Sequence, residues 1–241
     1  DFTVTGSTLA FASAPDFETQ QSYVVVVTAS DGSNTTTQEI TVNLTNVNDI
    51  APVFTSADAF SVAEGGTAVV TLTGTDDDDG TTPTFSTVLT GTDALDFDLT
   101  AGGVLTFKAT TDFENPIDAD IDNVYSITAT ITDGSNTSTQ AITITVTDTN
   151  DESPVLTVAT PYSVAEGATI VGTVTTTDAD AGATTSYSLT GTDNALFTIN
   201  SDGDIVFATA PDFESGRSNA YSLNVVVSDG TNQDVEAIIV N

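Results

Sequence analysis

The stretch Tyr125-Ser126-Ile127-Thr128-Ala129-Thr130-Ile131-Thr132-Asp133 alternates apolar and polar residues with a period of two. Its apolar members therefore share one face of an extended strand, with Ser and Thr mostly between them. A turn signal, Asp133-Gly134-Ser135-Asn136, follows directly. The next alternating run, with Ile142, Ile144 and Val146, predicts a second strand of the same kind. The segment thus indicates half-buried β-structure.

The same strand recurs from Tyr23 to Asp31 and from Tyr221 to Asp229, so the chain contains an internal repeat. Asp-Phe-Glu precedes each copy, starting at Asp16, Asp112 and Asp212, with spacings of 112 − 16 = 96 and 212 − 112 = 100 residues. Ser-Val-Ala-Glu-Gly occurs at 61–65 and 163–167, and Asn-Asp-x-x-Pro occurs at 48–52 and 150–154. The repeating unit is therefore about 100 residues long, a typical domain size.

The Asn-Asp-x-x-Pro stretches mark the predicted boundaries, because Pro52 and Pro154 stiffen the chain there. They divide the chain into the C-terminal half of a repeat (1–49), a complete repeat (50–151) and a nearly complete repeat (152–241). About seven short strands per repeat, with polar faces outward, are typical of a β-sandwich. We therefore predict an all-β chain of tandem Ig-like Greek-key sandwiches arranged as an elongated rod. The start at Asp1, inside a β-like pattern, suggests a piece of a longer protein.

The charge balance excludes several functions. The chain has 35 Asp and Glu against two Lys and Arg, a formal net charge of −33, which argues against nucleic-acid partners. It has no Cys and no His, so thiolate metal sites and imidazole bases are absent. No apolar run approaches the roughly 20 residues of a membrane-spanning helix. We therefore expect no enzyme and no membrane-spanning segment.

The acidic residues keep to fixed places in the repeat. Glu64, Asp112, Glu114 and Asp151 are far apart in sequence, yet in a sandwich all can reach one end of the module, beside the linker. The next repeat adds Asp178, Asp180 and Asp229. Converging carboxylates repel one another unless cations neutralise them. Carboxylate and carbonyl oxygens in this number suit Ca²⁺ better than Mg²⁺, which demands strict octahedral geometry.

With these motifs the chain resembles, over essentially its whole length, the tandem repeats of the cadherin superfamily, in the divergent form of large microbial surface proteins. The linker Asp148-Thr149-Asn150-Asp151-Glu152-Ser153-Pro154 follows the family pattern fully. Asp76-Asp77-Asp78 and Asp178-Ala179-Asp180 supply its Asp-x-Asp, and Ala29-Ser30-Asp31 supplies its Ala-x-Asp. The first linker departs from the pattern with Asn46 in place of Asp, at a position not expected to be a direct ligand. The chain also lacks the Trp that vertebrate cadherins use for strand swapping.

The resemblance implies about three Ca²⁺ ions at each junction between repeats. It assigns the metal ligands by position. At the first junction these are Asp16, Glu18, Asn48, Asp49, Asp76, Asp78 and Asp133. At the second they are Glu64, Asp112, Glu114, Asp151, Asp178, Asp180 and Asp229, with Asn150 through its side chain and Thr149 and Glu152 through their backbone oxygens.

Two local features remain open at this point. Asp118-Ala119-Asp120-Ile121-Asp122 is an insertion absent from the other copies, and it is either a solvated acidic loop or a site for an extra ion. The Phe of each Asp-Phe-Glu is expected to fill the core and not to recognise a partner.

The resulting functional hypothesis is a calcium-dependent structural or adhesion module, extracellular or on a cell surface, in which Ca²⁺ stiffens the junctions. One alternative is a self-assembling filament or matrix subunit. Another is a carbohydrate-binding module, which exposed aromatic residues on one sandwich face would favour. The corresponding partners are calcium ions, other copies of the chain, or surface polysaccharide.

Overall fold

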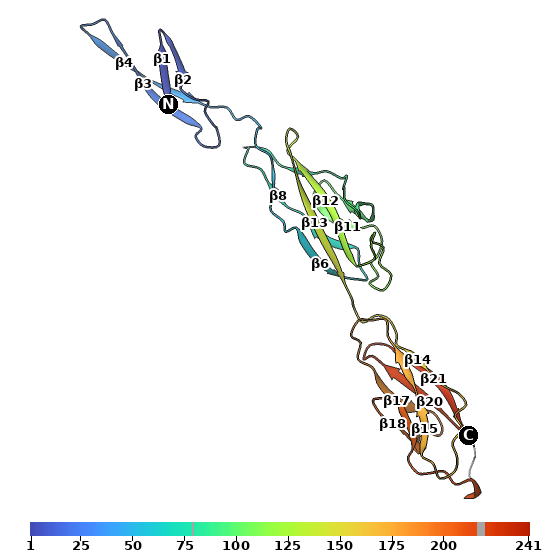
Figure 1. The fold of residues 1–241 in the computed structure, drawn as a ribbon. Coiled ribbons are helices and arrows are strands. Elements are labelled where there is room, and N and C mark those ends of the chain that lie inside the picture. The colour runs from blue at the N-terminus through green and yellow to red at the C-terminus, as the bar shows by residue number, and fades with distance from the viewer. Residues whose placement is uncertain (79, 216–219) are drawn as a thin grey trace. The chain divides into compact units, whose positions relative to one another are not determined.

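The computed structural model describes residues 1–78, 80–215 and 220–241 (Figure 1). It confirms an all-β chain, in which the helical pieces within these ranges are single 3₁₀ turns: η1 (Ala94–Asp96), η2 (Asn194–Leu196) and η3 (Phe213–Ser215). The chain forms two compact units, one of residues 1–111 and 116–146, the other of residues 112–115 and 147–241. The division into three repeats stays a prediction. No helix of the described residues has the length and apolar character needed to cross a bilayer.

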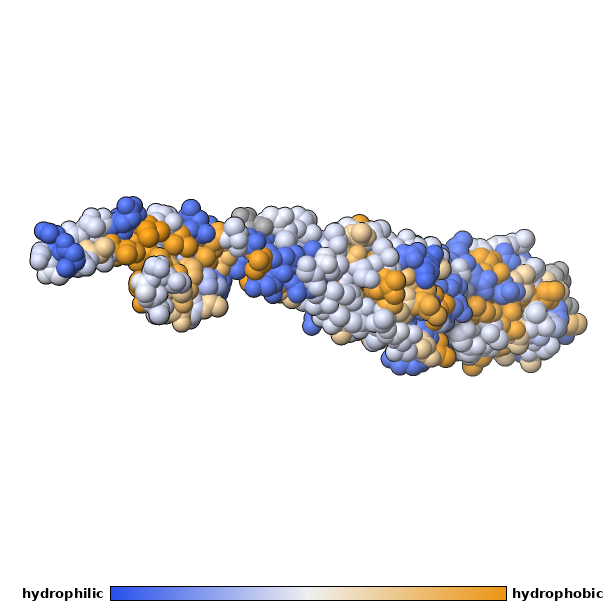
Figure 2. All heavy atoms as spheres, turned by 90° about the horizontal axis from the view of Figure 1, so that it is seen from above, coloured by the Kyte–Doolittle hydropathy of each residue, from blue (hydrophilic) through white to orange (hydrophobic). Residues whose placement is uncertain are grey.

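The first unit begins with two antiparallel hairpins. In the first, β1 (Phe2–Thr5) pairs with β2 (Thr8–Phe11). In the second, β3 (Ser22–Ser30) pairs with β4 (Thr35–Asn43) from Ser22↔Asn43 to Ser30↔Thr35. Val24 and Val26 of β3 are 63% and 57% exposed, where the complete repeat has Ser126 and Thr128. The expected polar outer face is therefore wrong for this strand, and Figure 2 shows apolar residues reaching the surface.

The complete repeat of the first unit contains two main sheets. One has the order β6 (Ala59–Ala63), β13 (Thr137–Thr147), β12 (Val124–Thr132) and β9 (Thr84–Phe85). The other has the order β10 (Phe97–Leu99), β11 (Val104–Phe107) and β7 (Ala68–Thr71), while β5 (Val53–Phe54) pairs with β8 (Gly74–Thr75). The predicted strand is β12, and its inward residues Tyr125, Ile127, Ala129 and Ile131 are at most 2% exposed.

The second unit repeats this plan. One sheet has the order β17 (Ser186–Thr190), β20 (Tyr221–Ser228) and β21 (Gln233–Val240). The other has the order β15 (Ile170–Thr173), β19 (Asp204–Phe207) and β18 (Phe197–Ile199), and β14 (Val155–Thr157) pairs with β16 (Thr175–Thr177). Residues of both sheets, such as Ile205, Leu223 and Val225, form one buried core.

A triad of aromatic rings joins the strands of every repeat. In the complete repeat Phe97, Phe107 and Tyr125 lie with centroids 4.3, 5.0 and 5.7 Å apart, and their exposed fractions are 1–3%. The first repeat has the same triad of Phe2, Phe11 and Tyr23 at 4.5, 5.0 and 5.9 Å, but its rings are only half-buried. The two triads have the same geometry, but we expect the first to stabilise its repeat less, because its rings bury less apolar area.

Replacement of Phe107 by Ala should destabilise its repeat by about 3–5 kcal/mol, the cost of a large cavity in a packed core. The equivalent Phe11→Ala should cost clearly less, because Phe11 is only half-buried. Chemical denaturation followed by tyrosine fluorescence measures both variants. Equal losses would show that burial does not distinguish the two triads.

Candidate metal centre

Each predicted Asp-Gly turn fixes its carboxylate by backbone hydrogen bonds. Between β12 and β13, Asp133 Oδ1 accepts hydrogen bonds from the backbone N–H groups of Ser135 and Asn136, both at 2.6 Å. Asp229 makes the same two bonds at 2.6 Å between β20 and β21. Burial works against ionisation of both residues, but these N–H donors outweigh it and hold the pKa of each carboxyl below its usual value. Both side chains are therefore anionic at neutral pH.

The Asp-x-Asp loops contribute a second set of carboxylates beside each linker. Asp76 Oδ1 accepts from the backbone N–H of Asp78 at 2.9 Å, and Asp178 Oδ1 accepts from that of Asp180 at 3.2 Å. The second Asp of each pair also holds the linker, because Asp78 accepts from Ile50 N–H at 3.0 Å. In the same way, Asp180 accepts from Glu152 N–H at 3.4 Å. The linker and the loop are thus joined by one carboxylate.

In the first unit these elements bring acidic residues into two overlapping groups. Glu18, Asp49 and Asp78 each place a carboxylate oxygen within 4.8 Å of the others, and Asp76, Asp78 and Asp133 do the same. Burial raises the pKa of Glu18, and the charges of Asp78 and Asp49 raise it further. The predicted convergence of the first-junction acids is therefore present for these five residues.

Two further predicted ligands of the first junction are Asn48, in the linker, and Asp16, in the Asp-Phe-Glu turn. Asn48 Oδ1 and the backbone oxygen of Asn48 accept from the side-chain amide of Asn136. Asp16 caps its own turn by accepting from the Thr19 hydroxyl at 2.9 Å and from the backbone N–H groups of Glu18 and Thr19. These bonds, the Thr19 hydroxyl first, lower the pKa of Asp16.

In the second unit Glu114, Asp151 and Asp180 form the corresponding group, again with ligand atoms within 4.8 Å. A hollow beside it is lined by Thr149, Asn150, Asp180 and Asp229, together with Asp148. Asp178 adjoins it through its bond to Asp180, and Glu152 through its backbone. Asp112 holds the Asn115 amide within the Asp-Phe-Glu loop. Glu64 belongs to the first unit, where it is 9% exposed.

The strongest chemical signal is a set of buried carboxylate oxygens that have no hydrogen-bond partner among the described residues. They are Glu18 Oε1, Asp76 Oδ2, Asp78 Oδ1, Asp148 Oδ1, Asp178 Oδ2, Asp180 Oδ2 and Asp229 Oδ2. Asp78 and Asp180 are only 2% and 6% exposed. A buried anionic oxygen without a donor is costly. All of these oxygens lie in or beside the two linkers. Anionic oxygen ligands of this kind fit a hard divalent cation.

Sequence reasoning missed Asp148, whose position it did not count among the ligands. In the structure Asp148 Oδ2 accepts a short hydrogen bond from Ala181 N–H, which follows the Asp-x-Asp motif, and Oδ1 is one of the unpartnered oxygens. The signal was present in the linker pattern, because Asp148 is the first residue of its Asp-x-Asn-Asp-x-x-Pro stretch. The first linker has Asn46 at this position.

The acidic insertion has an internal structural role. Asp118 is 5% exposed and accepts from the backbone N–H groups of Asp122 at 2.8 Å and Asn123 at 3.3 Å. Asp118, Asp120 and Asp122 also lie within 4.8 Å of one another. The charge of Asp122 is the main cause of the raised pKa of Asp120. An extra ion in this loop stays a hypothesis.

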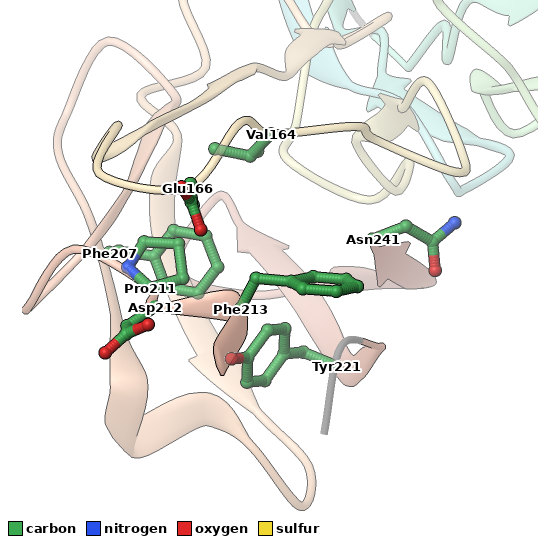
Figure 3. A pocket seen from close by; sticks show the side chains of 8 residues that line it. All are labelled: Val164, Glu166, Phe207, Pro211, Asp212, Phe213, Tyr221 and Asn241. Atoms are coloured by element: carbon green, nitrogen blue, oxygen red, sulfur yellow. The ribbon is translucent and has the colours of Figure 1, made fainter. Parts of the chain in front are cut away.

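The expectation that the Asp-Phe-Glu phenylalanines fill the core is wrong. Phe213 is 63% exposed, and Phe17 and Phe113 are only half-buried. The reason is that each Phe lies outside the strands of the sandwich, Phe17 and Phe113 in loops and Phe213 in the 3₁₀ turn η3. Phe213 projects beside Tyr221 in a shallow pocket that Val164 and Glu166 also line (Figure 3).

Replacement of Glu18 by Gln should raise the melting temperature of the first unit in chelator at pH 7. The raised pKa means that folding disfavours the charged form of Glu18, so the destabilisation exists above its unfolded-state pKa and disappears below it. Calorimetry at pH 7 and at pH 3 measures this difference, with Glu39→Gln as a matched control on β4. A lower melting temperature for Glu18→Gln at pH 7 would contradict the repulsion.

Comparison with known proteins supports the same architecture. Residues 48–147 match the family described as "Bacterial Ig domain". The human cadherin EGF LAG seven-pass G-type receptor 1 is 38% identical over 79 residues, 31% of this chain and 3% of that protein. Human protocadherin Fat 4 is 35% identical over 123 residues, 47% of this chain and 2% of that protein. The chain thus spans only a small part of these relatives.

Solved structures extend the likeness to nearly the whole chain. The protocadherin gammaB7 EC3-6 cis-dimer structure has a TM-score of 0.80 at 23% identity, covering 99% of this chain and 65% of that one. The protocadherin gammaB4 extracellular domain has a TM-score of 0.72 at 26% identity, covering 97% of this chain and 39% of that one. With its internal repeats and linker motifs, the chain is similar to tandem cadherin repeats and has the Ig-like sandwich fold.

Proposed function

We propose that the chain is an extracellular structural and adhesion module whose linkers bind Ca²⁺ and become rigid when they do so. The observation that carries this proposal is the set of buried, unpartnered carboxylate oxygens at both linkers. Two like charges about 5 Å apart repel by roughly 3 kcal/mol at an effective dielectric of 20. Several such pairs would loosen the linker unless a cation compensates them.

The residues fit Ca²⁺ in number and kind. Glu18, Asp49, Asp76, Asp78 and Asp133 would hold it at the first linker, and Glu114, Asp151, Asp178, Asp180 and Asp229 at the second. Backbone and amide oxygens from Asn48 and Asn150 would complete the 6–8 ligands that Ca²⁺ takes in flexible geometry, whereas Mg²⁺ demands a strict octahedron and keeps several of its waters. The resemblance to cadherin repeats implies about three ions per junction. The dissociation constant expected for extracellular modules, about 10⁻⁴–10⁻³ M, suits the medium outside cells.

The comparisons support this class of function. The relatives above are named as cadherins and protocadherins, and one is named as a seven-pass receptor, a protein of a cell surface. None of these names describes an enzyme. A carbohydrate-binding module receives no such support, because Phe213 is the one exposed aromatic residue, and every Phe and Tyr of the chain lies in the described ranges.

Addition of millimolar Ca²⁺ to the chain in chelator should increase the maximum dimension and reduce the flexibility seen by small-angle scattering. Asp180→Asn should weaken Ca²⁺ binding about tenfold or more, a loss typical of a disturbed metal site. Asp98→Asn on β10 removes the same charge outside these groups and should bind like wild type. Titration calorimetry measures the affinities. A scattering profile that is the same in chelator and in Ca²⁺ would leave the linker acids as a solubilising surface only.

A second candidate function, association between copies, is favoured by the exposed Val24 and Val26 on β3. One structural neighbour is itself described as a cis-dimer. Replacement of both residues by the Ser and Thr of the complete repeat should lower the association constant. Light scattering after size-exclusion chromatography tests this, and a wild-type chain that is monomeric at high concentration would contradict it.

A further inference from the structure

In each copy, the Asp-Gly turn that follows the Tyr-led strand has an Asn three residues after its Asp, at Asn34, Asn136 and Asn232. Backbone geometry explains the Asp and the Gly of these turns, since Gly134 has φ +99° and Asp133 caps the following N–H groups. It does not explain the Asn side chain, whose amide points away from its own backbone in the two later copies.

The amide nitrogen of Asn136 lies among four oxygen atoms. It donates to Asn48 Oδ1 at 2.9 Å, Asp133 Oδ2 at 3.1 Å, Ile50 O at 3.2 Å and Asn48 O at 3.5 Å. An amide NH₂ group has only two hydrogens, so it cannot satisfy four acceptors. Four oxygens from the linker and the turn therefore converge beside this side chain with too few donors to satisfy them, as oxygens do around a cation.

This cluster adjoins the proposed cation site directly. Asp133 shares its acidic group with Asp76 and Asp78. Asp78 is only 2% exposed, its Oδ1 has no donor, and its Oδ2 accepts from Ile50 N–H. Ile50 is therefore held from both sides, by Asp78 at its nitrogen and by Asn136 at its oxygen. The unpartnered Asp78 oxygen is independent evidence that a cation belongs here.

The other copies provide an internal comparison. Asn232 is half-buried and donates to the linker oxygen of Glu152 at 2.8 Å, the equivalent of Ile50. Asn34 is exposed, and its side-chain amide donates to Asp31 Oδ2 of its own turn at 3.3 Å. The amide thus reaches the linker in the two copies that follow an Asn-Asp-x-x-Pro stretch in this chain.

We propose that Asn136 is a further ligand of the first-linker cation, with Asn232 as its counterpart at the second linker. This inference rests on the proposed function. The two ends of an amide have nearly the same size, so a half-turn of the side chain exchanges Nδ2 for Oδ1 without repacking. The nitrogen faces the oxygens while no cation is bound, and the oxygen faces the cation when one is.

The test uses the full chain in an Asp180→Asn background, which weakens the second linker site. Asn136→Ala should raise the Ca²⁺ dissociation constant about tenfold or more, and Asn136→Asp should restore or exceed the affinity of the background, because a carboxylate supplies the same ligand. Asn34→Ala is the matched control and should leave the affinity unchanged. Titration calorimetry measures all four proteins.

A second readout follows the amide itself. The side-chain ¹⁵N–¹H₂ signals of Asn136, identified by their loss in Asn136→Ala, should shift on Ca²⁺ addition as the hydrogens leave their four acceptors. Those of Asn34 should not. Unchanged or tighter binding by Asn136→Ala would overturn the ligand role, and so would a failure of Asn136→Asp to rescue binding. Absence of Ca²⁺ binding by the wild-type chain would instead overturn the proposed function itself.

Discussion

Like charges placed close together and out of water are the constraint on which the rest of this molecule depends. The sandwiches can form from alternating apolar strands alone, but the linkers cannot be ordered by apolar contacts, because they carry buried carboxylates. Asp78 and Asp180 show the conflict most clearly, since each is almost fully buried and each keeps an oxygen without a donor. Such groups persist only where a compensating charge is available.

The hydrogen-bond pattern shows how the fold limits this repulsion. Backbone N–H groups of the Asp-Gly turns lower the pKa of Asp133 and Asp229, while burial, and after it the charges of Asp78 and Asp49, raise the pKa of Glu18. The linker residues Ile50 and Glu152 are held by a carboxylate at the nitrogen and by an amide at the oxygen. Order in the linker therefore comes from polar contacts within the same turns that end the core strands.

Much of the fold could be predicted because it follows from periodicity. The burial of Tyr125, Ile127, Ala129 and Ile131 on one face of β12 follows directly from their alternation. The grouping of Glu18, Asp49 and Asp78 followed from spacing and resemblance, since spacing repeated across copies reports a shared three-dimensional position. Phe213, Asp148 and Asn136 were different. Their roles depend on where a loop places one side chain, and neither hydrophobicity nor period encodes that.

The placement of the acidic motifs within a repeat has a consequence for how such chains grow. The complete repeat carries Asp-x-Asp and an Asp-Gly turn for the linker before it, and Asp-Phe-Glu with Asn-Asp-x-x-Pro for the linker after it. Half of each proposed cation site is therefore encoded on either side of a predicted boundary. Duplication of one coding segment of this length adds a sandwich and a matching interface together. Reach can thus be lengthened by gene duplication without new side-chain chemistry.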